Sequence, residues 1–141
     1  MKRRRKRPRG VVDTSVLVAG IAGFRAGKTR DLTPSAQFLL SWVERNTFTW
    51  LVSEEILDEY KRVLGRLGVR RNLIGSIVNL IREEAEFVPV PGRSGLSPDP
   101  GDDPICDCAE AGSADFIVTL NPKDFPQDRL SARVIAPDHP F

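Results

Sequence analysis

A single carboxylate interrupts an apolar run near the start of the chain. Asp13 lies within residues 10–20, GVVDTSVLVAG, where branched apolar residues on both sides favour a buried strand, and Thr14 and Ser15 follow it directly. An ionised carboxylate beside buried apolar residues is costly unless a metal ion, a cation or hydrogen-bond donors satisfy it. An aspartate that caps the turn after a strand explains the same stretch equally well. The role of Asp13 therefore depends on the other polar residues of the chain.

Other acidic residues occur where predicted strands end or predicted helices begin. Glu59 lies at the edge of the apolar face of one predicted helix, and Asp102 and Asp103 open another. Asn121 and Asp124 follow a predicted buried strand. In an open parallel sheet, sites form outside the carboxyl ends of the strands, so these acids are expected to converge with the first one and to repel one another. A hard divalent cation with oxygen ligands, Mg²⁺ or Mn²⁺, resolves this repulsion and suits phosphoryl chemistry.

The helix that carries Glu59 has a clear amphipathic pattern. Residues 53–68, SEEILDEYKRVLGRLG, begin with a capping serine and two acids that the helix dipole favours. On a helical wheel the apolar face comprises Ile56, Leu57, Tyr60, Val63, Leu64 and Leu67. Of the four acids in this helix, Glu59 lies nearest that face. Taken alone, a border residue whose stem covers apolar surface is the commoner reason for such a position.

Predicted strands alternate with predicted helices along the chain. The strands are expected at residues 11–18, 47–52, 87–90, 115–119 and 133–136. The helices are expected at residues 34–46, 53–68, 71–86 and 105–112. This alternation predicts an α/β unit with a mainly parallel sheet and right-handed crossovers.

Composition and length limit the class of protein. With 141 residues the chain is expected to form one domain with its own core. No apolar run is long enough to span a bilayer and the start lacks a signal peptide's apolar segment, so we expect a soluble, cytoplasmic protein with no membrane partner. Cys106 and Cys108 have a spacing that fits neither a disulfide framework nor a zinc knuckle, and His139 is the single histidine. Zinc sites and histidine acid–base chemistry are therefore disfavoured.

Basic residues are concentrated at two places near the N-terminus. Residues 1–9 hold seven of the 21 Lys and Arg, which leaves 14 basic against 19 acidic residues, a net charge of −5, for the expected folded domain of residues 10–141. Such a run is either a flexible arm that binds nucleic acid or a solvated tail, and both interpretations fit equally. A basic segment, residues 20–30, resembles a phosphate-binding loop, but an alanine stands where that loop requires glycine, so nucleotide binding is the less favoured interpretation. A flexible loop is preferred, in which Arg25, Lys28 and Arg30 contact phosphates.

Four segments taken together resemble the PIN domains, small metal-dependent nucleases that include the toxin half of many bacterial toxin–antitoxin pairs. The segments are VVDTSVLVAG, SEEILDEYKRVL, DDPICDCAEAGSADFIVT and TLNPKDF, in the order of that family, and they cover nearly the whole chain from Gly10. The resemblance implies a three-layer α/β/α fold with a parallel sheet of four or five strands. It also implies an Mg²⁺- or Mn²⁺-dependent endoribonuclease that hydrolyses RNA phosphodiester bonds.

The resemblance assigns catalytic roles position by position. The first family aspartate falls on Asp13 and the helical glutamate on Glu59. The third acid falls on Asp102, seven residues before Ala109, with Asp103 as the near alternative. In the implied mechanism Asp13 and Asp102 or Asp103 hold the metal ion, and Glu59 positions or deprotonates the attacking water.

The fourth acidic position departs from the family pattern. Many members have an acid where this chain has Asn121, so Asp124 is assigned that catalytic role and a second metal ion depends on it. Thr14 and Thr119 resemble the hydroxyls beside the family's metal, and with Asn121 they are expected to lie behind the metal ligands and orient the bound water molecules.

The implied partners are RNA, contacted by Arg25, Lys28 and Arg30, and an antitoxin protein. A homodimer is expected through the helices of residues 53–86, because residues 73–81 hold more apolar side chains than one helical stripe needs. Two rival functions stay open. A catalytically inactive RNA- or protein-binding module is favoured by Asn121, and a nucleotide-binding switch would use residues 23–29.

Overall fold

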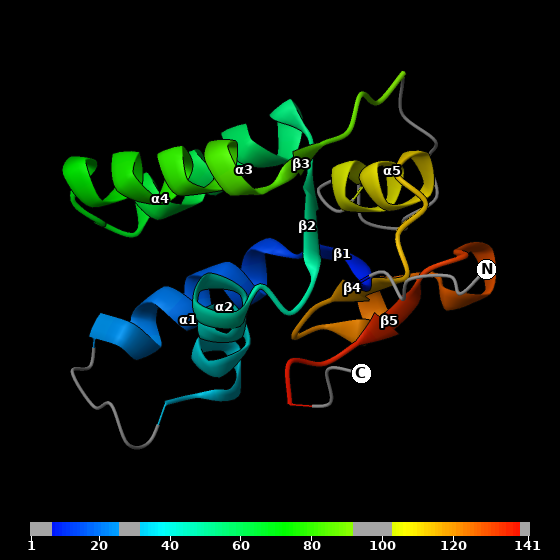
Figure 1. The fold of residues 1–141 in the computed structure, drawn as a ribbon, viewed down its shortest axis with the longest axis horizontal. Coiled ribbons are helices and arrows are strands. Elements are labelled where there is room, and N and C mark those ends of the chain that lie inside the picture. The colour runs from blue at the N-terminus through cyan, green and yellow to red at the C-terminus, as the bar shows by residue number, and fades with distance from the viewer. Residues whose placement is uncertain (1–6, 26–31, 92–102, 139–141) are drawn as a thin grey trace, which may run out of the picture.

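A computed structural model describes residues 7–25, 32–91 and 103–138 of the chain, without the side chains of Arg25 and Asp103. Its centre is a five-stranded sheet in the order β3-β2-β1-β4-β5, with every neighbouring pair parallel (Figure 1). The strands are β1 (Arg9–Val12), β2 (Thr49–Val52), β3 (Glu86–Phe87), β4 (Phe116–Val118) and β5 (Arg133–Ile135). The predicted parallel α/β sheet is confirmed.

Helices cover both faces of the sheet and give the predicted three layers. They are α1 (Thr14–Arg25), α2 (Pro34–Arg45), α3 (Glu54–Arg66), α4 (Arg71–Glu84) and α5 (Asp103–Ala111), and two short 3₁₀ turns, η2 (Pro122–Asp124) and η3 (Gln127–Arg129), precede β5. Figure 1 shows α3, α4 and α5 on one side of the strands and α1 and α2 on the other. No helix of the described residues is both long and apolar enough to cross a membrane.

An aromatic cluster packs α2 against the sheet. Its rings belong to Phe38, Trp42, Phe48, Trp50 and Phe116, and the ring centroids of Trp42 and Trp50 lie 4.7 Å apart in an edge-on arrangement. In β1, Gly10 lies beside this cluster, where an added Cβ would approach Phe116 Cζ to 2.0 Å. The core therefore requires glycine in the strand that leads to Asp13.

The first strand is shorter than the sequence predicts. It ends at Val12, and residues 14–18 belong to α1, as do the first residues of the predicted basic loop. The buried side of this segment consists of Val16, Leu17, Gly20 and Ile21, which follows the helical period. A short apolar run has no periodicity that separates a strand from a buried helix, and this is why the prediction was wrong here.

The capping residues of α2 and α3 were predicted correctly, whereas the ends of some helices and strands were not. Thr33 Oγ1 accepts a hydrogen bond from the backbone of α2, and Ser53 Oγ accepts one from the backbone of α3. In contrast, Leu67, which the wheel places on the core face, is 56% exposed because α3 has already ended. The strand predicted at residues 87–90 is Glu86–Phe87, and the preceding helix ends two residues early, at Glu84.

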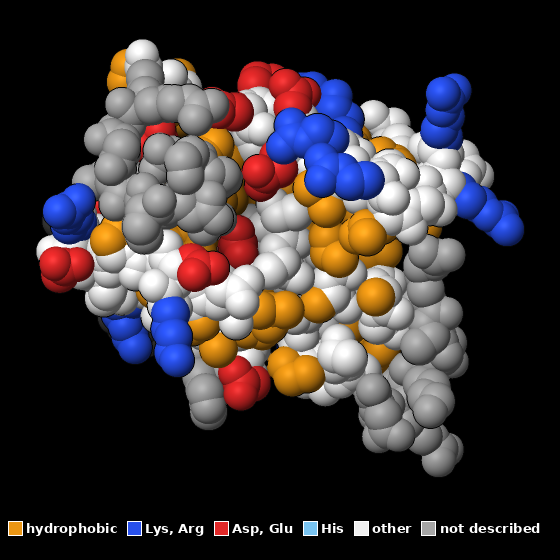
Figure 2. Space-filling model, turned by 180° about the vertical axis from the view of Figure 1, so that it is seen from behind, with side chains coloured by type: hydrophobic (Ala, Val, Ile, Leu, Met, Phe, Trp, Pro, Cys, Tyr) orange, Lys and Arg blue, Asp and Glu red, His pale blue; other side chains and the backbone are white. Residues whose placement is uncertain are grey.

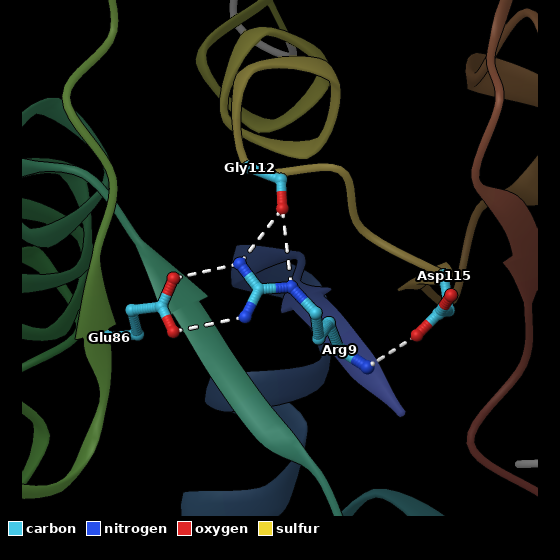
Figure 3. A network of polar contacts seen from close by, with 4 residues as sticks. All are labelled: Arg9, Glu86, Gly112 and Asp115. Atoms are coloured by element: carbon cyan, nitrogen blue, oxygen red, sulfur yellow. Dashed lines mark hydrogen bonds and ion pairs between the residues drawn. The ribbon is translucent and has the colours of Figure 1, made fainter. Parts of the chain in front are cut away.

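An ion-pair network fixes the amino end of β1 (Figure 3). Arg9, which falls within the predicted arm, is the first residue of β1 and donates both guanidinium Nη atoms to the carboxylate of Glu86, at 3.0 and 2.7 Å. Its Nη2 also donates to the carbonyl of Gly112 at 2.9 Å, and its backbone N–H to Asp115 Oδ2 at 2.8 Å. Arg9 thus joins β1 to β3 and to the turn between α5 and β4, at the end of the strand opposite to Asp13.

Candidate active site

Asp13 lies immediately after the central strand. Its backbone N–H donates to the carbonyl of Val118 in β4 at 2.9 Å, and its carbonyl accepts from Val16 N–H at 3.0 Å in the first turn of α1. The residue therefore continues the β1–β4 pairing while it also starts a helix. The residue is only 6% exposed, so it lies at the carboxyl end of the sheet largely out of contact with water.

Two hydroxyl groups hold one oxygen of the Asp13 carboxylate. Ser15 Oγ donates to Asp13 Oδ2 at 2.6 Å, and Thr119 Oγ1 donates to the same oxygen at 2.9 Å. Each hydroxyl in turn accepts a backbone N–H from the segment after β4, Ser15 from Leu120 at 3.1 Å and Thr119 from Asn121 at 3.0 Å. Within the described residues, no donor reaches Oδ1. The arrangement fixes the carboxylate through Oδ2 and leaves Oδ1 as the oxygen for a further ligand.

Glu59 joins this site from α3. Thr14 Oγ1 donates to Glu59 Oε2 at 2.5 Å, so the residue next to Asp13 contacts the helical glutamate directly. The other oxygen, Oε1, lies 3.7 Å from Arg62 Nη2, and the Glu59 side chain is 18% exposed. The remaining acids of α3, Glu54, Glu55 and Asp58, are exposed. The predicted border position of Glu59 is therefore confirmed.

Tyr60 anchors α3 to the strand that leads to Asp13. It is fully buried, its hydroxyl donates to the carbonyl of Val12, and its ring packs edge-on against Trp50 with centroids 6.2 Å apart. Burial raises the pKa of Tyr60 well above its usual value, and the nearby Asp13 and Glu59 carboxylates act in the same direction. The neutral phenol therefore donates a hydrogen bond to the Val12 carbonyl, and this bond holds α3, with Glu59, close to Asp13.

The other predicted site residues are placed less completely. Asp102 lies outside the described residues, as does the side chain of Asp103, although α5 begins at Asp103. Because α5 precedes a parallel strand, it starts at the same edge of the sheet as Asp13. Asp124 is exposed at the end of η2, and Asn121 is exposed beside Thr119. Among the described side chains, no three acidic, histidine or cysteine residues lie close enough to hold a metal ion.

The predicted phosphate contacts also fall outside the described part of the chain. Neither Lys28 nor Arg30 is described, and of Arg25 only the backbone is. Conversely, the structure places Ser15 beside Asp13 and Arg62 beside Glu59, and neither residue was assigned a role from the sequence. The signal for Ser15 was present as a second hydroxyl two residues after Asp13, and that for Arg62 as a cation one helical turn after Glu59.

Comparison with known proteins places the chain in a family. No curated protein matches the sequence. A family model described as PIN domain matches residues 9–123, which is most of the chain and includes Asp13, Glu59 and Thr119. The matched region also contains the first four strands and the five α-helices of the described residues. The chain belongs to the PIN domain family, whose members are generally nucleases.

Proposed function

We propose that the protein is an Mg²⁺- or Mn²⁺-dependent endoribonuclease that hydrolyses RNA phosphodiester bonds at the site formed by Asp13 and Glu59. The observation that carries this proposal is the Asp13 carboxylate, which is nearly buried and held through Oδ2 while no described residue donates to Oδ1. A nearly buried carboxylate that presents one free oxygen fits a divalent cation better than it fits a structural hydrogen bond. Membership of a nuclease family supports the same conclusion.

The donor set fits a hard cation. Asp13 with Asp102 or Asp103 would hold the ion through carboxylate oxygens, and Asp124 is the candidate fourth acid. The hydroxyls of Ser15 and Thr119 orient the Asp13 carboxylate, which is how residues behind metal ligands usually act. A bound Mg²⁺ or Mn²⁺ would supply positive charge that offsets the phosphate and makes water more acidic.

Glu59 is the residue proposed to position or deprotonate the attacking water. Its Oε2 accepts the Thr14 hydroxyl, and its Oε1, which lies 3.7 Å from Arg62 Nη2, is the oxygen proposed to face the water. Cysteine nucleophiles do not fit this site. Burial raises the pKa of the Cys108 thiol to about 12, so the thiolate is scarce at neutral pH.

Association with protein partners is a second part of the proposal. An apolar groove of about 300 Å³ lies between α4 and the pair α1–α2, with Trp42 and Trp50 in its lining. The exposed side chains along it are Phe24, Val43, Leu73 and Leu80. Figure 2 shows hydrophobic side chains gathered on this face. We assign the exposed α4 residues to a homodimer, and sedimentation that shows a monomer at every concentration would contradict it.

We propose the toxin role and the antitoxin partner from the family resemblance. The proposed homodimer rests instead on the exposed apolar residues of α4. The rival function is a catalytically inactive RNA- or protein-binding module, which the uncharged Asn121 favours. Incubating the purified protein with labelled single-stranded RNA separates the two. We expect cleavage that requires Mg²⁺ or Mn²⁺ and stops with EDTA. RNA that is bound but uncut at every divalent cation concentration would support the module instead.

A further inference from the structure

A cation lies at the rim of the candidate active site. Arg62 Nη2 is 3.7 Å from Glu59 Oε1, and the other oxygen of Glu59 accepts the hydroxyl of Thr14, the neighbour of Asp13. The Arg62 side chain is 61% exposed, and within the described residues its guanidinium forms no hydrogen bond. The Arg62 guanidinium thus lies near the acids and is largely open to solvent.

The pairing of Arg62 with Glu59 is easily exchanged. The two residues are three positions apart on α3 in an exposed ion pair, the kind that contributes little to stability. A guanidinium presents five donors in a planar fork that matches the oxygens of a phosphate. An incoming phosphate therefore offers Arg62 more hydrogen bonds than the single contact with Glu59 does.

The acidic residues of the site disfavour the binding of RNA unless a nearby cation offsets their charge. Asp13 and Glu59 converge here, and both would repel the backbone of an RNA strand. A metal ion held by Asp13 would supply charge that offsets the phosphate at the bond to be cut, whereas the neighbouring phosphates need other cations.

We propose that Arg62 is a substrate-binding residue that exchanges Glu59 for a backbone phosphate of the RNA strand, beside the bond that is cut. This inference rests on the proposed function because it takes RNA as the substrate. The exchange has two effects: it holds the strand at the site, and it releases Glu59 from its cation when the substrate arrives. The contact is to phosphate, so it positions the strand without reading its bases.

Lys61 provides a matched control on the same helix. It forms an equivalent ion pair with Asp58, three positions earlier, at 3.3 Å, and Asp58 is exposed and not part of the site. Replacing Lys61 by Gln removes one charge and one exposed ion pair, as replacing Arg62 by Gln does. A difference in RNA affinity between the two variants therefore reflects the position of the cation on α3 and not the loss of one charge.

The test is the affinity for a labelled single-stranded RNA, measured by fluorescence anisotropy over a salt series. All variants carry Asp13→Asn so that the RNA stays intact. We expect Arg62→Gln to bind roughly tenfold more weakly than Lys61→Gln, as for one lost charged hydrogen-bonding group. Its salt slope should be smaller by about 0.7, the value of one phosphate on a single strand. Arg62→Lys should fall between, because lysine keeps the charge without the fork.

Each outcome decides the proposal. Equal affinities for Arg62→Gln and Lys61→Gln would overturn it, and so would a protein that binds no RNA. If Arg62→Gln does not fold, which its thermal unfolding midpoint would show, a loss of affinity in Arg62→Lys still supports the proposal and unchanged affinity overturns it. RNA affinity that depends on Arg62 in a wild-type protein that never cleaves with Mg²⁺ or Mn²⁺ would sink the nuclease proposal alone.

Discussion

The hydroxyl of Thr14 donates to Glu59 Oε2 across 2.5 Å, so the first residue of α1 and a residue in the second turn of α3 are in direct contact. Thr14 follows Asp13, and through this bond the two acids are held at one edge of the sheet although 46 positions separate them in the sequence. Tyr60 reinforces the same junction through the Val12 carbonyl. Hydrogen bonds within the protein therefore hold the two acids at the same end of the sheet.

Glu59 and Asp58 provide a direct test of which acid of α3 acts. Glu59→Gln should lower the cleavage rate by roughly a hundredfold or more, because an amide cannot accept a proton from water. Asp58→Asn should leave the rate unchanged, since Asp58 is exposed and paired with Lys61. Single-turnover cleavage of labelled RNA measures both rates. Equal losses in the two variants would show that the geometry of α3 does not select Glu59.

The substitution Asp13→Asn should abolish cleavage and leave the fold intact. The amide oxygen can still accept the hydroxyls of Ser15 and Thr119, but the uncharged side chain is a poor ligand for Mg²⁺. Loss of a negative charge near Glu59 should leave the thermal unfolding midpoint of the metal-free protein unchanged or slightly raised. Normal RNA cleavage by this variant in Mg²⁺ or Mn²⁺ would remove Asp13 from the proposed mechanism.

The two hydroxyls behind Asp13 should control metal affinity. In Ser15→Ala the Asp13 carboxylate loses one of its two described donors, and a backbone N–H at Leu120 loses its acceptor. We expect Mn²⁺ binding, followed by calorimetry, to weaken about 10- to 100-fold, the usual effect of residues behind a ligand. Ser76→Ala, in an exposed turn of α4, is the control and should bind Mn²⁺ as the wild type does. Unchanged affinity in Ser15→Ala would mean that the hydroxyl serves the fold alone.

Much of the fold followed from the sequence because amphipathic periodicity and capping residues are local signals. Glu59 could be placed at the border of its helix from the wheel alone, and Ser53 could be recognised as its cap. The start of α1 could not be placed, because apolar residues lie on both sides of Asp13, Thr14 and Ser15 and each run is too short to show a period. The contacts of Ser15 with Leu120 and of Thr119 with Asp13 depend on the register of β1 against β4, which no local pattern reveals.

The Arg9–Glu86 ion pair should make stability depend on acid (Figure 3). The hydrogen bonds from Arg9 lower the pKa of Glu86 below its ordinary value of 4.5, so the pair stabilises the fold above that pH. As the pH falls through the lowered pKa, the carboxylate is protonated and this contribution is lost. Both groups are partly exposed, so Glu86→Gln should cost only about 0–1 kcal/mol at neutral pH. Urea unfolding of both proteins should converge in acid, and a difference that persists there would contradict the ion pair as its cause.

A deletion that tests the basic N-terminus must keep Arg9, because Arg9 belongs to the first strand of the sheet. Residues 1–6 lie outside the described part of the chain, whereas Arg9 is tied to Glu86, Gly112 and Asp115. Deleting residues 2–6 removes five cations and keeps this network, so the fold should keep its thermal midpoint. If the arm contacts RNA, the deletion should weaken binding and reduce the salt slope by about 0.7 for each phosphate contact that is lost. Cleavage at saturating RNA should be unchanged, because β1 enters the sheet at the end opposite to Asp13.

A second deletion, of residues 2–9, separates the arm's charge from the structural role of Arg9. It removes the ion pair with Glu86 and the first residue of β1, so it should lower stability as well as RNA affinity. The comparison requires binding curves over a salt series and unfolding curves for both deletions. Superimposable binding curves for the wild type and the 2–6 deletion would show that those residues are only a solvated tail. A 2–9 deletion as stable as the wild type would show that Arg9 does not anchor β1.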